Sequence, residues 1–199
     1  MRYRADQKAN ARAALLQSAT RALRQSGFNG IGVDALAASA GVTSGAFYSN
    51  FSGKEALLKE VIDANLGQPF IDTDSGTAAQ RRRRLKDYLK MYISGAHRAD
   101  AANGCVMPAL SADVARSSDT VREIYRQRMR ELIAKTARVI GGDVGVAESR
   151  AWTVVALMVG AVSVARALPE GDEAERVLDA ALQQAVAVID GAQATKTAG

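Results

Sequence analysis

Apolar residues recur three and four positions apart along most of this chain, the spacing that places side chains on one face of an α-helix. No stretch alternates apolar and polar residues in the manner of a β-strand. Glycines and prolines interrupt the helical pattern and divide it into about nine segments. The sequence therefore predicts an all-α fold.

The most informative stretch is 32–51, which predicts two short helices joined by a tight turn. The first helix has apolar residues on one face at Val33, Leu36, Ala37 and Ala40. Gly41 follows, and glycine readily adopts the left-handed conformation that ends a helix. Thr43 can then cap a second helix, from Ser44 to about Phe51, by accepting a backbone N–H. This order is typical of a helix-turn-helix motif, whose second helix enters the major groove of DNA.

The second helix of the motif has a surface suited to docking. Small or hydrogen-bonding groups come from Ser44, Gly45, Tyr48 and Ser49. Phe47 and Phe51, four positions apart, can face inward. The alternative is a helical hairpin inside an unrelated core, in which Tyr48 is a half-buried aromatic residue.

A further helix is expected directly after the motif, and it favours the first interpretation. Ser52 and Glu55 match a capping box, with Lys54 in the first helical turn. Free N–H groups at a helix start, together with a lysine, favour a phosphate group. This helix should extend to about Leu66 and connect the motif to the rest of the chain.

These residues resemble a known family. The matching run is Gly27-Phe28, Val33, Leu36-Ala37, Ala40-Gly41-Val42-Thr43, Gly45-Ala46-Phe47-Tyr48, Phe51 and Lys54-Glu55-Ala56-Leu57. It resembles the N-terminal domain of the TetR family of bacterial transcriptional repressors, over about Lys8 to Pro69. The resemblance implies a three-helix DNA-binding domain at residues 9–69 that binds a pseudo-palindromic double-stranded operator. It implies phosphate contacts by Thr43, Tyr48 and Lys54, and contacts with bases or backbone by Ser44, Gly45, Ala46 and Ser49.

Three positions depart from the family pattern. Gly32 stands where Thr or Ser often caps the first helix of the motif, a change that costs only a few tenths of a kcal/mol. Ser44 stands where Lys or Arg is frequent, and Asn50 where His is frequent. These two departures affect the expected base readout and one phosphate contact, and they leave the motif itself intact.

A second domain is predicted at residues 77–190, after a loop at 68–80 that contains Pro69 and Gly76. Its helices are expected at about 81–97, 109–116, 121–140, 146–168 and 172–190. Four arginines, 81–84, could suggest nucleic acid, but at the start of an amphipathic helix they are expected to form a solvated face. By resemblance, this second domain binds a ligand and mediates dimerisation.

The last two predicted helices are apolar over too much of their circumference to be buried on one side only. Small residues such as Gly160, Ala161 and Ala181 permit close helix crossing. If the two helices pair with their copies, they form a four-helix bundle between two subunits. The alternative is that both are central helices of a monomer; the family resemblance favours the homodimer.

The net charge of +5 is concentrated in the proposed DNA-binding part. Residues 1–60 carry a net charge of +4, and the remaining residues carry +1. A basic excess on the first part is what contact with DNA phosphates requires.

The single cysteine excludes an intramolecular disulfide, and the first residues lack the apolar segment of a signal peptide. We therefore expect a cytoplasmic protein. The longest apolar run, Ala151 to Ala165, is shorter than the ~20 residues that a membrane helix needs, so a buried helix is expected there and no membrane partner.

A small-molecule effector is implied for the second domain by the family resemblance. Polar tips among apolar walls are what such a pocket needs, and the candidates are Tyr88, Tyr92, Cys105, Tyr125, Met129 and Trp152. His97 is the only histidine and has no partners at metal-ligand spacing, so neither a metal site nor a cofactor is predicted.

Cys105 has a second interpretation besides packing. It follows Asn103-Gly104 at the expected start of a helix, where free N–H groups lower the pKa of a thiol. A Gly-Cys pair at this place resembles a subset of TetR-like repressors that sense electrophiles through a cysteine. A buried, unreactive cysteine is the alternative.

The sequence therefore favours a ligand-responsive DNA-binding regulator, most simply a repressor that is released by a small molecule or electrophile. An enzyme with Cys105 as nucleophile and His97 as base is disfavoured, because no paired carboxylates, phosphate-binding glycine loop or nucleotide fingerprint accompanies them. No catalytic residue is predicted. A ligand-independent architectural DNA-binding protein is the remaining alternative, and the large, nearly neutral second domain argues against it.

Overall fold

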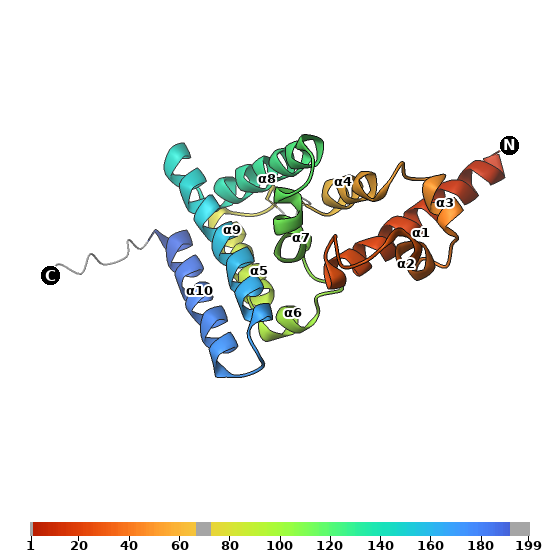
Figure 1. The fold of residues 1–199 in the computed structure, drawn as a ribbon. Helices are drawn as coiled ribbons and strands as arrows, with labels where there is room; N and C mark the ends of the chain where they lie inside the picture. The colour runs from red at the N-terminus through yellow and green to blue at the C-terminus, as the bar shows by residue number, and fades with distance from the viewer. Residues whose placement is uncertain (1, 67–72, 192–199) are drawn as a thin grey trace. The chain divides into compact units, whose positions relative to one another are not determined.

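The computed structural model describes residues 2–66 and 73–191, with side chains placed at residue 9 and from residue 12 onward within those ranges (Figure 1). These residues form ten α-helices and no β-strand, which confirms the predicted all-α class. The helices are α1 Arg2–Ser26, α2 Val33–Ser39, α3 Ser44–Tyr48, α4 Lys54–Asn65, α5 Ala78–Tyr92, α6 Gly95–Ala99, α7 Val106–Ala115, α8 Asp119–Ile140, α9 Val144–Ala167 and α10 Asp172–Asp190.

The tenth helix arises because the helix expected at 81–97 is two helices. α5 ends at Tyr92, and Ile93 leaves the helical conformation with φ −90° and ψ 70°. Ser94 then begins α6, since its hydroxyl accepts a hydrogen bond from the His97 backbone N–H at 3.2 Å. The prediction of one continuous helix to His97 was wrong.

The start of α5 also lies outside the expected bounds. Thr77 and Gln80 form a complete capping box, so the helix begins at Ala78, inside the segment that was expected to be a loop. The arginines that follow are not simply solvated. Arg81 donates to the Gly76 carbonyl and Arg84 to the Ser75 carbonyl. These two side chains hold the preceding turn against the helix.

The chain divides into two compact units. The first contains the described residues of 1–66 together with 101–128, and the second contains those of 67–100 together with 129–199. The segment 101–128, which we expected in the second domain, therefore packs with the first unit, and α8 contributes residues to both. The functional domain limits of 9–69 and 77–190 remain a prediction, and residues 67–72 lie outside the described part.

The first unit is built around α1, which packs against α2, α4 and α7 (Figure 1). Its core consists of apolar side chains with almost no exposed surface, among them Leu15, Leu23, Leu36, Phe47, Leu57, Leu58 and Leu110. The buried apolar side chains of α1 therefore pack against its neighbouring helices, α2 of the motif among them. This arrangement holds α2 and α3 in place from behind.

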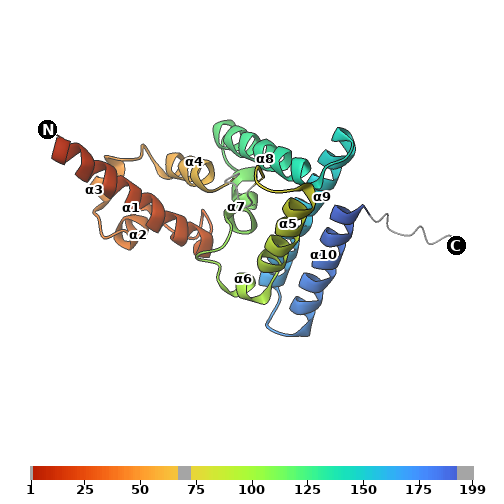
Figure 2. The ribbon, with the colours of Figure 1, turned by 180° about the vertical axis from the view of Figure 1, so that it is seen from behind.

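In the second unit, α10 packs against both α9 and α5 (Figure 2). α6 is fastened to the end of α9 by two arginines. Arg98 donates to the carbonyls of Ala165 at 2.6 Å and Leu168 at 2.9 Å. In return, Arg166 donates to the carbonyl of His97 at 2.8 Å.

α9 is less buried than the sequence suggested. Val144, Trp152 and Val164 are exposed by 81%, 44% and 50%, respectively, although the opposite face of the helix is buried. With 24 residues, α9 is long and apolar enough to cross a membrane by length and composition, contrary to the expectation from the shorter apolar run. A core helix of a soluble protein meets the same criterion, and α9 packs against α10. Packing within the subunit therefore does not account for the exposed apolar residues of α9.

Candidate nucleic-acid interface

The turn between α2 and α3 has the geometry of a Schellman motif. Gly41 adopts φ +68°, the left-handed conformation that was predicted for it. The Gly41 N–H donates to the Ala38 carbonyl and the Val42 N–H donates to the Ala37 carbonyl, both at 3.0 Å. These two bonds fix the direction in which the chain leaves α2.

α3 begins as predicted and ends sooner. Thr43 is its N-cap, and the Thr43 hydroxyl accepts a hydrogen bond from the Ala46 N–H at 3.2 Å. The helix ends at Tyr48 rather than at Phe51. Ser49 Oγ and Asn50 Nδ2 both donate to the Ala46 carbonyl at 2.8 Å, and such side-chain bonds compete with continuation of a helix.

The outer face of α3 is open to solvent. Thr43, Gly45, Tyr48 and Ser49 are exposed, whereas Ser44 and Ala46 are half-buried. Tyr48 is 58% exposed, although its ring packs edge-on against Phe47 with centroids 5.4 Å apart. Phe47 and Phe51 are buried, as expected from their spacing. Six of the seven predicted DNA-contact residues thus lie on or beside one short helix.

Ser44 has a partner that the sequence did not indicate. Its hydroxyl donates to the carboxylate of Asp34, an exposed residue on α2. The Ser44 hydroxyl is therefore oriented before any ligand arrives. Asn50, one of the departures from the family pattern, is likewise engaged through its Nδ2 atom, whereas its Oδ1 atom is buried without a hydrogen-bond partner.

The capping box predicted at the start of α4 is absent. The N-cap is Gly53, which has no side chain to offer, and Ser52 makes no capping hydrogen bond. Glu55 instead accepts a hydrogen bond from the backbone N–H of Ser118 at 2.8 Å. This bond lowers the pKa of the Glu55 carboxyl. The first N–H groups of α4 therefore have no side-chain cap.

Lys54, the seventh predicted contact, is held at this same helix start. Its ammonium lies over the ring of Phe28, 4.4 Å from the centroid, in a cation–π contact. Partial burial lowers the pKa of Lys54, and the negative charge of Asp113 acts in the opposite direction. Lys54 therefore has a defined position beside the uncapped end of α4.

Asp113 of α7 fixes the backbone of Phe28, the residue whose ring contacts Lys54. It is only 8% exposed, and its carboxylate accepts a hydrogen bond from the Phe28 N–H at 3.0 Å and one from Arg116 at 3.1 Å. Gly27 lies directly against it with φ +69°, and a Cβ atom there would be 3.4 Å from the carboxylate. Sequence reasoning missed Asp113, because a single aspartate in an apolar helix carries no signal of a partner 85 residues away.

A third acidic residue joins α4 to α8 within the same unit. The guanidinium of Arg128 donates to Asp63 through Nε at 2.9 Å and through Nη2 at 2.7 Å. Together with the bond between Glu55 and Ser118, this pair attaches α4 to α8 near both ends of α4. The helix that begins at Lys54 is thus bound to the segment 101–128.

The predicted effector residues fall into separate groups. In the first unit, Cys105 is the N-cap of α7, with its sulfur 3.5 Å from the Met107 nitrogen. Tyr125 shares a 2.8 Å hydrogen bond with Ser111, and burial raises the pKa of the Tyr125 phenol. In the second unit, the rings of Tyr88 and Tyr92 contact each other at a tilt of 44°, with centroids 5.8 Å apart, and Met129 is buried.

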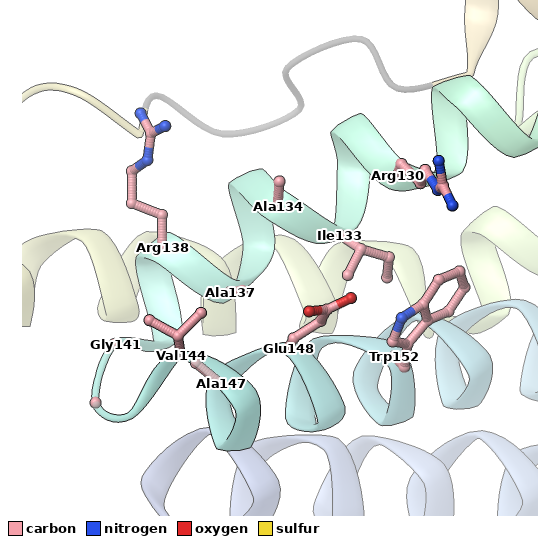
Figure 3. Close-up of a pocket in the computed structure, with 11 residues that line it drawn as sticks. Arg130, Ile133, Ala134, Ala137, Arg138, Gly141, Val144, Ala147, Glu148 and Trp152 are labelled. Carbon is pink, nitrogen blue, oxygen red and sulfur yellow. The ribbon is translucent and has the colours of Figure 1, made fainter.

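Trp152 is the one predicted effector residue that lines a pocket between α8 and α9. This pocket of about 700 Å³ lies between α8 and α9, within the second unit (Figure 3). No group of three metal-ligating side chains that could hold an ion occurs in residues 2–66 and 73–191.

Comparisons with known proteins identify a family domain in the chain. The family model described as bacterial regulatory proteins, tetR family, matches residues 15–61, which contain the C-terminal part of α1, all of α2 and α3, and most of α4. The chain is also 30% identical over 136 residues to the HTH-type transcriptional regulator EthR of Mycolicibacterium smegmatis. The chain therefore contains a TetR-family domain. The EthR alignment covers 66% of this chain and 59% of EthR.

Solved structures of other proteins share the fold over nearly the whole chain. NemR of E. coli in its reduced form has a TM-score of 0.69 at 22% identity, covering 94% of this chain and 99% of NemR. A TetR-family regulator from Agrobacterium tumefaciens has a TM-score of 0.70 at 16% identity, covering 89% and 98%. At these identities the likeness concerns the fold.

Proposed function

We propose that this protein is a DNA-binding transcriptional regulator whose α3 enters the major groove of an operator. The observation that carries the proposal is the α2–α3 motif, with a fixed turn and an outward face of small and hydroxyl-bearing residues. Four residues of this face are exposed and open to a partner: Thr43, Gly45, Tyr48 and Ser49. The matching family model and the relative EthR are both described as regulators.

Phosphate contacts are assigned to Thr43, Tyr48 and Lys54, and contacts with bases or backbone to Ser44, Gly45, Ala46 and Ser49. The exposed Tyr48 hydroxyl and the uncapped start of α4 beside Lys54 support the phosphate role. The Ser44 hydroxyl would contact a base either after its hydrogen bond to Asp34 breaks or through the oxygen lone pairs that this bond leaves free.

Replacing Lys54 with Ala should weaken binding to every duplex by a similar factor. Removal of one phosphate contact should also reduce the slope of log K against log salt by about one unit. Tyr48→Phe should weaken all sequences similarly, by loss of one hydrogen bond. The measurement is fluorescence anisotropy across a salt series, with Lys90→Ala on α5 as control. An unchanged slope with an altered base preference would contradict the phosphate role of Lys54.

A homodimer is the proposed assembly, because α9 carries an exposed strip of small and apolar residues. Ala156, Gly160, Val164 and Ala167 are exposed and three or four positions apart, so they lie on one face of the helix. Small residues let two helices approach closely, and α10 packs beside α9. Pairing α9 and α10 with their copies would bury this strip in an intersubunit four-helix bundle.

Gly160 offers a test that leaves the folded subunit undisturbed. A Cβ atom at Gly160 would meet no atom within 4 Å inside the subunit. Gly160→Glu should therefore keep the helical content and convert dimer to monomer at micromolar concentration. Light scattering measures this, with Gln127→Glu on the exposed face of α8 as control. A wild-type protein that is monomeric, or a Gly160→Glu variant that stays dimeric, would refute this dimer.

Regulation by a small molecule follows if an effector favours one arrangement of α4 over another. α8 is continuous from Asp119 to Ile140, and its first part is bound to α4 through Glu55 and Asp63. An effector that displaces α8 would therefore pull on the helix that starts at Lys54. To weaken DNA binding a hundredfold, it must favour the released state by about 2.7 kcal/mol, a normal coupling free energy.

Cys105 is one route to such a displacement, since it caps α7, the helix that carries Asp113. An electrophile added to the half-exposed thiol would introduce bulk at the start of this helix. Treatment with a quinone or a maleimide should weaken operator binding at least tenfold in wild type and leave Cys105→Ser unchanged. If both proteins lose DNA equally, or neither responds, Cys105 only packs and the effector binds non-covalently.

The cytoplasm is the proposed compartment, and repression is the proposed direction of control. A regulator accounts for the observed site better than the alternatives do. A cysteine enzyme would need a base that activates Cys105, and the contacts described for His97 and Cys105 are structural: His97 Nδ1 lies 2.7 Å from the Tyr92 carbonyl oxygen, and Cys105 is the N-cap of α7. An architectural protein would leave the pocket between α8 and α9 without a role.

A further inference from the structure

The pocket between α8 and α9 has the size of a small-molecule site. Its volume of about 700 Å³ lies within the range of typical ligand pockets. The walls come from the second half of α8, the Gly141-Gly142 turn and the first half of α9 (Figure 3). We call it the α8–α9 groove.

The groove exists because small residues stand where the two helices face each other. Ala134 and Ala137 of α8 and Ala147 of α9 line the groove, and their short side chains leave room in it. The turn that joins the helices has both glycines at positive φ, +72° and +95°. Asp143 then caps α9 by accepting from the Val146 N–H at 3.2 Å. The frame of the groove is therefore built into the backbone.

Apolar side chains form the floor and two open walls. Ile133 is buried in the floor, whereas Val144 and Trp152 remain 81% and 44% exposed at opposite ends. An indole that is half open to solvent beside an apolar floor offers a stacking surface to a flat ring. The groove thus favours an aromatic ligand.

Charged side chains on the rim of the groove determine which polar groups of a ligand it can bind. Arg130 and Glu148 make no hydrogen bond or ion pair within the part of the chain that the structure describes, and both reach toward the groove near Trp152 (Figure 3). Arg138 instead turns away toward Asp74, 3.7 Å from its carboxylate. Since Arg138 is paired with Asp74, the groove offers Arg130 to an anionic group and Glu148 to a hydrogen-bond donor.

We propose that the α8–α9 groove is the effector site and that it takes an aromatic acid bearing a hydroxyl or amino substituent. The carboxylate pairs with Arg130, which can bind it through two parallel N–H groups. The ring lies over Ile133 against Trp152, and the substituent donates a hydrogen bond to Glu148. The proposal rests on the proposed function for its role as effector site, because the bound ligand acts on α8.

Binding of the probes is measured on the full chain in its own oligomeric state, in the absence of DNA. The probes are hydroxynaphthoate, its methyl ester and the corresponding aminomethyl naphthol, which keep the ring and change the charge. Calorimetry gives the affinity, and emission of Trp152, the only tryptophan, reports whether the ring reaches the groove. We expect saturable binding of the acid, emission changes with it, and at least tenfold weaker binding of the ester and the amine.

Four variants locate the site. Arg130→Gln should weaken the acid at least tenfold, and Ala134→Leu should weaken it by filling the exposed floor. Glu148→Gln replaces a charged acceptor with a neutral one and should weaken the acid less than Arg130→Gln does. Arg138→Gln is the matched arginine control and should stay within threefold. All four positions are exposed, so thermal unfolding should remain close to wild type.

Three outcomes would overturn the proposal. These are no saturable binding of the acid, tighter binding of the amine than of the acid, and full affinity in Ala134→Leu. Failure of the proposed function is read separately, by duplex binding in the absence of any probe. A protein that binds DNA and not the acid loses only the groove assignment. If the acid binds as expected and leaves DNA affinity unchanged, the groove is a binding site and its role as effector site is refuted.

Discussion

The left-handed conformation of Gly41 is the constraint on which the DNA-binding part depends. Two backbone bonds close the turn around this residue, and only a residue without a Cβ adopts its φ of +68° at low cost. The turn directs the chain so that Thr43 can cap α3 and Phe47 can enter the core. Tyr48, the next residue, is then necessarily on the outside. A short five-residue helix gains its position from this turn and from Phe47 rather than from its own stability.

A second feature connects this reading helix to the remainder of the molecule. Three acidic side chains, Glu55, Asp63 and Asp113, each bond across to the other segment of the first unit. Two of them hold α4 to α8, and Asp113 holds the backbone that carries the Phe28 ring under Lys54. α8 continues into the second unit, where it lines the groove beside Trp152. In the first unit, the same helix is bonded to α4, which begins at Lys54.

Sequence reasoning succeeded where the deciding interactions are local. The roles of Gly41 and Thr43 follow from neighbours within five residues, and the inward spacing of Phe47 and Phe51 is a property of one helix turn. It failed where a distant partner wins. Glu55 satisfies the backbone of Ser118 rather than that of Ser52, and no pattern within α4 shows that 63 residues later an N–H group lacks an acceptor.

The candidate effector site shows the same limit. Six residues were chosen for their chemistry, and only Trp152 lines the groove, because five of the ten other lining residues are alanines or glycines, which have no chemical signature. The break between α5 and α6 could have been found, since Ser94 followed by Gly95 is a recognisable helix start. The exposure of α9, by contrast, depends on which helices pack around it.

The central claim is that α3 reads DNA from a symmetric dimer, and selection of bound duplexes from a random-sequence pool tests it most directly. The account predicts enrichment of a pseudo-palindrome whose half-sites lie about one helical turn apart, or slightly more. Gly45→Glu is the matched variant, since a Cβ there meets only Thr43 Oγ1 at 3.8 Å and the fold should persist. A carboxylate on this face should abolish the enrichment. Recovery of the same motif by Gly45→Glu, or of no motif by the wild-type protein, would contradict the account.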